Sequence, residues 1–151
     1  MPRYYFEDFV PGTVALPGSV TVTADAIVAF AREFDPHPFH VDEEAAKKTF
    51  AGGLIASGWH SCALLMRLVA DGYILDSSSM GGPGVEELRW LKPVRPGDTL
   101  RARRTVLETR ASRSRPEMGL IRLNSELINQ ADETVMTQLS WGMMGRRDAA
   151  P

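Results

Sequence analysis

The apolar residues in the first quarter of the chain recur with the period of a helix. They fall at i, i+3, i+4 and i+7, the spacing of one amphipathic face, at Ile27, Phe30, Ala31 and Phe34. Thr23 is suited to cap the N-terminus of this helix, and Asp25 falls in its first turn, where negative charge is favoured. Because Pro36 disfavours helical geometry at the preceding residue, the pattern predicts that the helix ends at Asp35.

The most apolar segment of the chain covers residues 59–73 and reads WHSCALLMRLVADGY. Its acidic and basic residues are Arg67 and Asp71, four apart and therefore able to pair on one face. A helix this apolar around most of its circumference is normally buried. The segment therefore predicts a central core helix, with Ser57 as its N-cap and Gly72 at its C-terminus.

The remaining pattern is mostly that of strands. The acidic run at residues 42–44 indicates the start of a short second helix that ends at residues 52–53. Alternating or β-rich segments predict strands over residues 14–23, 85–91, 99–109, 120–129 and 134–144. The later strands follow one another without intervening helices, so an α+β fold is expected, with an antiparallel sheet wrapped around the long central helix.

Composition limits the class of protein. At 151 residues the chain is expected to form a single domain, residues 1–151, with 44% hydrophobic and 24% charged residues. A net charge of −2 offers no general attraction to nucleic acid or to an acidic membrane surface. Cys62 is the lone cysteine, so an intrachain disulfide is excluded. The N-terminus lacks an apolar signal-peptide core and no run reaches transmembrane length, which makes the cytoplasm the expected location.

Candidate chemistry lies between the two predicted helices. Asp35 and His40 are five residues apart, and Gly58 opens the central helix eighteen residues later. A carboxylate and an imidazole can move a proton, and a free helix N–H can bond an oxygen that becomes negative during a reaction. The helix end and burial are both expected to raise the pKa of Asp35, whereas positive charge on His37 would oppose them and lower it. In the alternative interpretation, Asp35 caps a turn, His40 is a hydrogen-bonded interior residue, and Gly58 starts an ordinary core helix.

Two short motifs resemble those of a known family. The sequence DPHPFH (residues 35–40), followed by IASG (residues 55–58), is similar to the hydratase motif of the MaoC-like family, the (R)-specific enoyl-CoA hydratases. That motif reads Asp-x-Asn-Pro-x-His and then Ile-x-His-Gly. The segment VEELRWLKPVRPGDTL also resembles the sheet region that follows the central helix in the family. The departures are His37 in place of Asn and Ser57 in place of His.

The resemblance implies a hotdog fold and a function. Asp35 and His40 would activate a water for addition to C3 of a trans-2-enoyl-CoA, or catalyse the reverse dehydration of a 3-hydroxyacyl thioester. The Gly58 N–H would bond the thioester oxygen, and His37, Ser57 and Trp59 are expected to contact the substrate. The resemblance implies no metal or redox cofactor, and it implies a homodimer or higher homo-oligomer.

Other interpretations stay open at this stage. An acyl-CoA thioesterase would need a carboxylate on or near the central helix, where Asp71 is the sole candidate and lies at the wrong end. A non-catalytic subunit that binds acyl thioesters would account for the departures from the motif. The three histidines form no ligand pattern such as His-x-x-x-His, so no metal site is predicted. An arginine-rich stretch of the sheet is either a solvated face or a contact for coenzyme A phosphates: Arg101, Arg103, Arg104, Arg110, Arg113 and Arg115.

Overall fold

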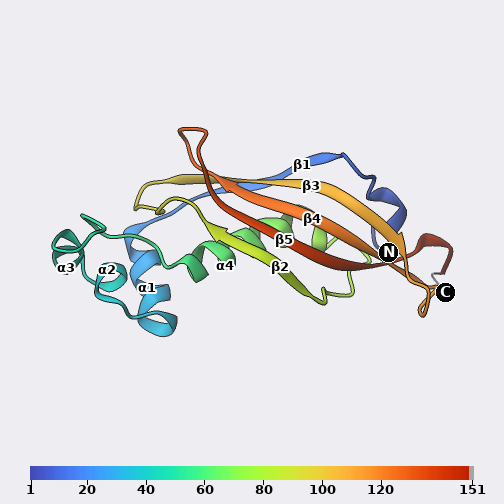
Figure 1. Cartoon of the computed structure of the whole chain (residues 1–151), viewed down its shortest axis with the longest axis horizontal. Coiled ribbons are helices and arrows are strands. Elements are labelled where there is room, and N and C mark those ends of the chain that lie inside the picture. Colours follow the sequence, from blue (N-terminus) through green and yellow to red (C-terminus); the bar gives the residue numbers. More distant parts are fainter. Residues whose placement is uncertain (150–151) are drawn as a thin grey trace.

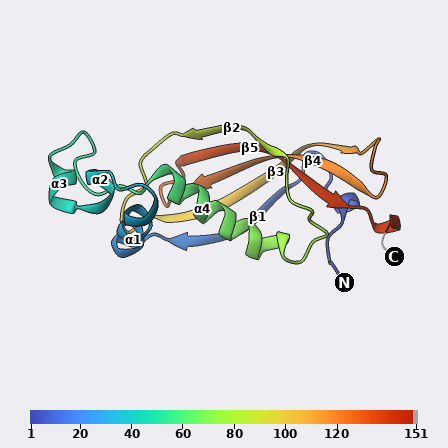
Figure 2. The ribbon, with the colours of Figure 1, turned by 90° about the horizontal axis from the view of Figure 1, so that it is seen from below.

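The computed structural model describes residues 1–149 of the chain. Within them, five strands form one antiparallel sheet in the order β1-β3-β4-β5-β2 (Figures 1 and 2). The strands are β1 (Val14–Thr21), β2 (Gly84–Trp90), β3 (Thr99–Ala111), β4 (Met118–Ile128) and β5 (Thr134–Gly145). All five lie within three residues of their predicted bounds, which confirms the α+β class.

The central helix lies across one face of this sheet, as Figure 2 shows. It consists of α4 (Gly58–Val69) and a π-helical continuation, η2 (Ala70–Ile74). Gly72 is therefore inside the continuation and does not end the helix as predicted. A Cβ at this glycine would lie 2.6 Å from the backbone oxygen of Pro17 in β1, so its small size serves close packing of helix on sheet.

The core fills the space between the central helix and the sheet. Residues on alternate positions of the strands meet the apolar face of α4, as expected for a sheet with one buried face. The members with the least exposed surface include Leu65 from α4 and, from the strands, Leu100, Val106, Ile121, Leu127 and Met136. Burying one such side chain stabilises the fold by about 1.5–3 kcal/mol.

Three short helices project from one end of the sheet, and the N-terminus and the end of β5 lie toward the other end (Figure 1). They are α1 (Ala24–Phe34), α2 (Pro38–Val41) and α3 (Glu43–Lys47). The predicted caps are confirmed, since Thr23 accepts a hydrogen bond from the Ala26 N–H and Ser57 accepts one from the Trp59 N–H.

Pro38 is the first residue of α2, a position that suits the fixed φ and missing N–H of proline. One detail of this region differs from the sequence expectation. The following helix, α3, ends at Lys47, several residues before the two glycines at 52–53. Remaining short elements are the 3-10 turns η1 (Phe6–Asp8) and η3 (Arg147–Ala149). Across the described residues, every helix is too short or too polar to cross a bilayer.

Candidate active site

Asp35 is fixed by the end of α1. Its backbone N–H donates to the Ala31 carbonyl, and its φ of −154° takes the chain out of the helix, as predicted from Pro36. Its side chain is mostly buried and accepts two hydrogen bonds: one from the Ser57 hydroxyl to Oδ2, at 2.6 Å, and one from His37 Nδ1 to Oδ1. The loop after α1 and the start of α4, which are 22 residues apart in the sequence, thus meet at one carboxylate.

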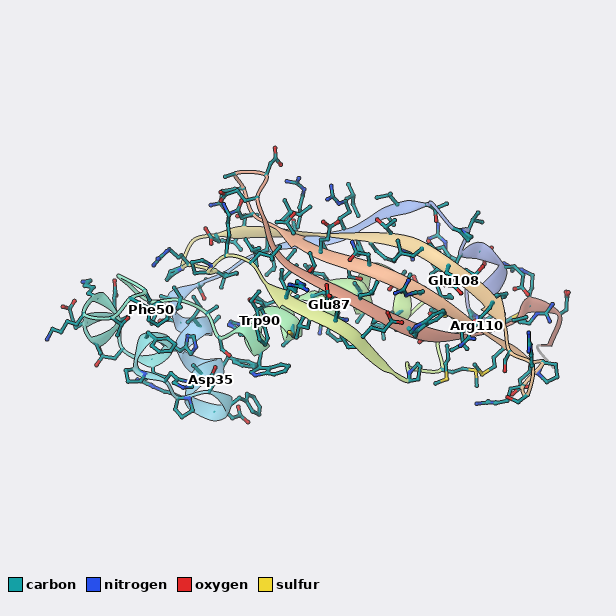
Figure 3. All side chains as sticks on the ribbon, viewed as in Figure 1. Asp35, Phe50, Glu87, Trp90, Glu108 and Arg110 are labelled. Atoms are coloured by element: carbon teal, nitrogen blue, oxygen red, sulfur yellow. The ribbon has the colours of Figure 1, made fainter. Side chains whose placement is uncertain are left out.

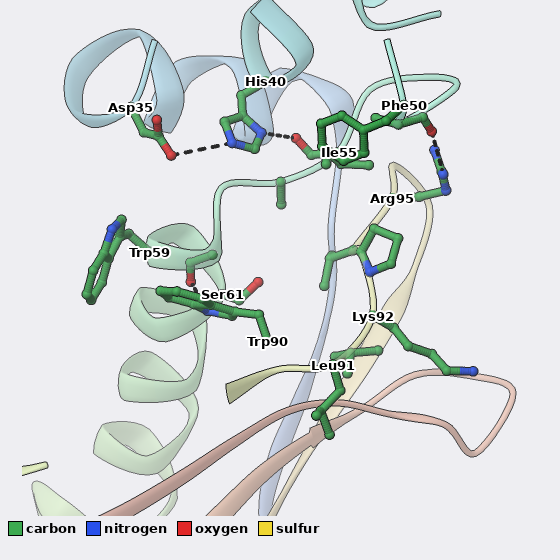
Figure 4. A pocket seen from close by; sticks show the side chains of 16 residues that line it. Asp35, His40, Phe50, Ile55, Trp59, Ser61, Trp90, Leu91, Lys92 and Arg95 are labelled. Atoms are coloured by element: carbon green, nitrogen blue, oxygen red, sulfur yellow. Dashed lines mark hydrogen bonds and ion pairs between the residues drawn. The ribbon is translucent and has the colours of Figure 1, made fainter. Parts of the chain in front are cut away.

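His40 is buried beside this carboxylate. Its Nδ1 lies 2.7 Å from the Ile55 carbonyl oxygen, and its Nε2 lies 3.4 Å from Asp35 Oδ2 (Figure 4). The Ile55 N–H in turn donates to the Phe39 carbonyl, so the loop before α4 is tied to α2 on both sides of His40. Because a carbonyl oxygen can only accept, Nδ1 carries a hydrogen and Nε2 presents a lone pair toward Asp35 in the neutral ring.

The electrostatics of Asp35 differ from the sequence expectation. Burial does push its pKa upward, but hydrogen bonds from Ser57 and His37, together with the charge of His40, push it further downward. The net result is a pKa below the ordinary value, so the predicted rise is wrong. The sequence shows the helix end but not the donors that the fold brings to it. Asp35 is therefore ionised at neutral pH.

The structure brings Ser57 and His37 to Asp35. Ser57 has no exposed surface and links the carboxylate to the N-terminus of α4, since the same hydroxyl accepts from the Trp59 N–H at 3.2 Å. The His37 side chain is 64% exposed and stacks on the Phe39 ring, with centroids 5.2 Å apart. Contact of these two residues with a substrate stays a prediction.

Gly58 is the first residue of α4, so its N–H has no acceptor within the helix. The Trp90 indole packs directly against it, with Nε1 donating to the Gly58 carbonyl at 3.0 Å. A Cβ at position 58 would lie 2.4 Å from this ring, which explains the glycine by packing within the chain. Trp59 meets Trp90 edge to face at 5.2 Å, and both rings are largely exposed.

A pocket of about 460 Å³ lies beside these residues at the helical end of the sheet (Figure 4), but His37 and Ser57 are not among the residues that line it. Asp35, His40 and Gly58 are on its wall, together with Trp59. The loop after β2 contributes further residues that sequence reasoning missed: Leu91, Lys92, Pro93, Val94 and Arg95. The one clue in the sequence is that these residues follow Trp90 directly. Only the fold shows that their loop faces the start of α4.

The arginine-rich stretch does not line this pocket. Arg110 lies far along the sheet from Asp35 (Figure 3), with its guanidinium over the Trp141 ring. Other members form ion pairs with carboxylates: Arg101 with Asp132, Arg103 with Glu126 and Arg115 with Glu117. These contacts within the chain account for four of the six arginines, whereas the Arg104 guanidinium lies over the rings of the core residues Phe9 and Tyr73.

A second cavity, of about 350 Å³, continues along the central helix. The same face of α4 lines both spaces: Gly58 and Ser61 in the first, then Cys62, Leu65, Met66 and Val69 in the second. Its other wall comes from β2, β4 and β5 and from the Gly-rich loop before β2. The two cavities therefore follow one another along one face of α4, and they have no lining residue in common.

Comparison with known proteins identifies this architecture. A protein from Mycobacterium tuberculosis with a double hotdog fold aligns with 98% of this chain and 46% of its own length, at 21% identity and a TM-score of 0.80. A MaoC-like dehydratase from Rhodospirillum rubrum aligns over 95% of this chain and 98% of its own, at 41% identity and a TM-score of 0.88. The class is thus a hotdog protein with an Asp–His pair beside its central helix, which confirms the predicted fold.

Sequence comparisons give the family. A model described as the MaoC like domain matches residues 8–124. The uncharacterized protein YdeM of Bacillus subtilis (strain 168) is 33% identical over 129 residues, covering 85% of this chain and 90% of that protein. Mesaconyl-CoA hydratase of Cereibacter sphaeroides is 42% identical over 67 residues, which cover 44% of this chain but 19% of that enzyme. The chain belongs to the MaoC-like dehydratase family.

Proposed function

We propose that this protein adds water to a trans-2-enoyl thioester, or dehydrates a 3-hydroxyacyl thioester in the reverse reaction. The observation that carries the proposal is the Asp35–His40 pair, whose facing atoms lie 3.4 Å apart on the wall of a pocket that also contains the start of α4. The identity shared with mesaconyl-CoA hydratase supports the same reaction class. Neither residue requires a cofactor for this chemistry.

The geometry suits activation of one water molecule. A water between Asp35 Oδ2 and His40 Nε2 can donate one hydrogen to each, because both atoms are acceptors. The lowered pKa of Asp35 keeps the carboxylate ionised at neutral pH, so it can accept a hydrogen bond from this water. In hydration, an O–H bond of the water would break as its proton passes to the Asp35–His40 pair, and the oxygen would bond to C3 of the enoyl thioester. The electrons of the C2=C3 π bond would move toward the thioester carbonyl, and the pair would return a proton to C2 from the same side.

The start of α4 would supply a hydrogen-bond donor to the thioester oxygen. The free Gly58 N–H would bond the thioester oxygen as negative charge develops on it. One such donor typically contributes about 2.7–4 kcal/mol to transition-state stabilisation. Beyond this point the acyl chain would follow the apolar face of α4, past Cys62 and Leu65 into the second cavity.

The thioesterase alternative finds less support. Asp71 is the carboxylate of the central helix, and it pairs with Arg67 at 2.7 Å on the exposed surface, outside both cavities. A water held there would be remote from any thioester lying beside Gly58. The non-catalytic alternative predicts binding of acyl-CoA without turnover.

The test follows crotonyl-CoA by its enoyl absorbance beside an assay for free thiol. Asp35→Asn and His40→Ala are each expected to lower kcat/KM by about 10²-fold or more, the usual contribution of a general acid or base. Asp71→Asn is the matched control, because it makes the same carboxylate-to-amide change outside the site, and it should keep the wild-type rate.

Circular dichroism spectra must show that the variants fold. The proposal is wrong if both site variants keep more than about a tenth of wild-type kcat/KM, a loss below about 1.4 kcal/mol. Release of thiol without loss of the double bond would favour the thioesterase, and binding with neither signal would favour the non-catalytic subunit.

A further inference from the structure

The departure of this chain from its family's motif adds a third potential metal ligand to the site. Asp35, His37 and His40 each place one carboxylate oxygen or ring nitrogen within 4.8 Å of the other two. We propose that these three residues bind a divalent transition-metal ion of the zinc class, and that the ion blocks hydration by taking the position of the reacting water. The binding stands on the geometry alone, and the inhibition rests on the proposed function.

The donor set is of the kind such ions prefer. Two imidazole nitrogens and one carboxylate oxygen suit Zn²⁺ and its neighbours in the first transition row, with metal–ligand bonds of about 2.0–2.2 Å. Bonds of this length at tetrahedral angles separate neighbouring donor atoms by about 3.4 Å. The distance from His40 Nε2 to Asp35 Oδ2 is 3.4 Å, so this edge of the site needs little movement.

The surroundings orient these ligands as in established metal sites. His40 Nδ1 is bonded to the Ile55 carbonyl, the arrangement that fixes a histidine with its other nitrogen free to coordinate. Ser57 holds the Asp35 carboxylate from the side of α4 at 2.6 Å. His37 is mostly exposed, so its ring can move outward from Asp35 to a bonding distance without disturbing the core.

His37 is the residue that distinguishes this site from a simple Asp–His pair. Its Nδ1 already faces Asp35 Oδ1, while His40 Nε2 faces Oδ2 of the same carboxylate. An asparagine at this position could keep a hydrogen bond to Asp35 but would give a much poorer ligand for zinc than imidazole. The remaining coordination positions would face the pocket, where the ion would hold its own water in place of the one between Asp35 and His40.

The experiment titrates the chelator-treated full-length protein with ZnCl₂ in a calorimeter and with CoCl₂ in a visible spectrometer. Wild type should bind one Zn²⁺ per chain and show d–d bands of Co²⁺ at low coordination number. His37→Asn should bind Zn²⁺ at least about tenfold more weakly, the minimum expected when even an outer-shell partner is lost. His60→Asn is the matched control, because His60 lies on α4 outside the cluster, and it should bind like wild type.

A measurement on the wild-type protein covers the case in which the His60 variant fails to fold. In a spectrum of ring-labelled histidine, Zn²⁺ should shift the signals of His37 and His40 and leave that of His60 unchanged. Absence of binding up to millimolar Zn²⁺, equal affinity in His37→Asn, or a shift confined to other residues would overturn the proposed site.

The inhibition is tested separately with crotonyl-CoA. Zn²⁺ should lower the wild-type rate in step with occupancy, EDTA should restore it, and His37→Asn should need about tenfold more Zn²⁺ for the same fractional loss. A rate that is unchanged or increased at full occupancy would overturn the inhibitory role. If wild type has no hydratase activity at all, the proposed function fails while the calorimetric result still decides the metal site.

Discussion

The Ser57 hydroxyl is expected to set both the stability of the site and the protonation of Asp35. It is fully buried, donates to Asp35 Oδ2 at 2.6 Å and accepts from the Trp59 N–H at 3.2 Å. A hydrogen bond to a charged group contributes about 1.5–3 kcal/mol, and an N-cap about 1 kcal/mol. Ser57→Ala should therefore lower the free energy of unfolding at pH 7 by about 2–4 kcal/mol.

The pH dependence follows from the sign of the Asp35 shift. Because the folded protein holds the pKa of Asp35 below its ordinary value of 3.8, the carboxylate contributes stability above that pH and loses the contribution as pH falls through the folded value. Removing the Ser57 donor raises the folded pKa toward the ordinary value. The difference in stability between wild type and Ser57→Ala should thus be largest near pH 7 and narrow below pH 3.8.

The assay combines urea unfolding with a titration of the Asp35 carboxyl carbon by NMR. Thr23→Ala is the matched control, since it removes an N-cap of the same kind from α1 without touching Asp35. It should cost about 1 kcal/mol and leave the titration of Asp35 unchanged. The reasoning would be refuted if Ser57→Ala lost no more stability than Thr23→Ala and Asp35 titrated as in wild type.

Three further outcomes are expected. Gly58→Val should lower the unfolding temperature because its Cβ meets the Trp90 ring. Adding Trp90→Ala should recover part of this loss. A double variant that is no more stable than the single one would contradict this packing. Burial lowers the pKa of His60 below 6.5, so the wild-type protein should lose stability as the pH falls below 6.5. Urea unfolding at pH 7.5 and 5.5 should show a smaller loss of stability for His60→Phe. The exposed Val85, Trp90 and Leu91 on and beside the edge strand β2 favour a homodimer, and sedimentation that finds only monomer at micromolar concentration would count against it.

The elements of this fold are readable from the sequence where a single local rule decides them. The period of residues 27–34, the cap at Thr23 and the proline after Asp35 all act over no more than about two helical turns, and the structure follows each of them. The errors arise where a distant partner decides. Gly72 has the character of a helix end, but Pro17 packs against it and the helix continues.

In the site too, the features set by nearby residues were predicted and those set by distant residues were missed. The spacing of Asp35 and His40 on either side of Pro36 indicates a carboxylate and an imidazole in one loop, and the structure brings them together. The direction of the Asp35 pKa shift could not be decided from this spacing. The strongest hydrogen-bond donor to the carboxylate, Ser57, is 22 residues away and reaches it only when α4 docks beside α1.

Gly58 illustrates how one residue can satisfy two demands. In the sequence, a glycine at a helix start is explained by the approach of a ligand to the backbone. In the structure, the space beside its Cα is occupied by Trp90, whose indole also donates to the Gly58 carbonyl. The two explanations are compatible, because the carbonyl and the N–H of a first-turn residue point in opposite directions along the helix. Trp90 therefore fixes the helix start by packing on Gly58 and bonding its carbonyl, without using its N–H. Loss of activity in a Gly58 variant consequently identifies an oxyanion contact only when the stability of the same variant has been restored through Trp90.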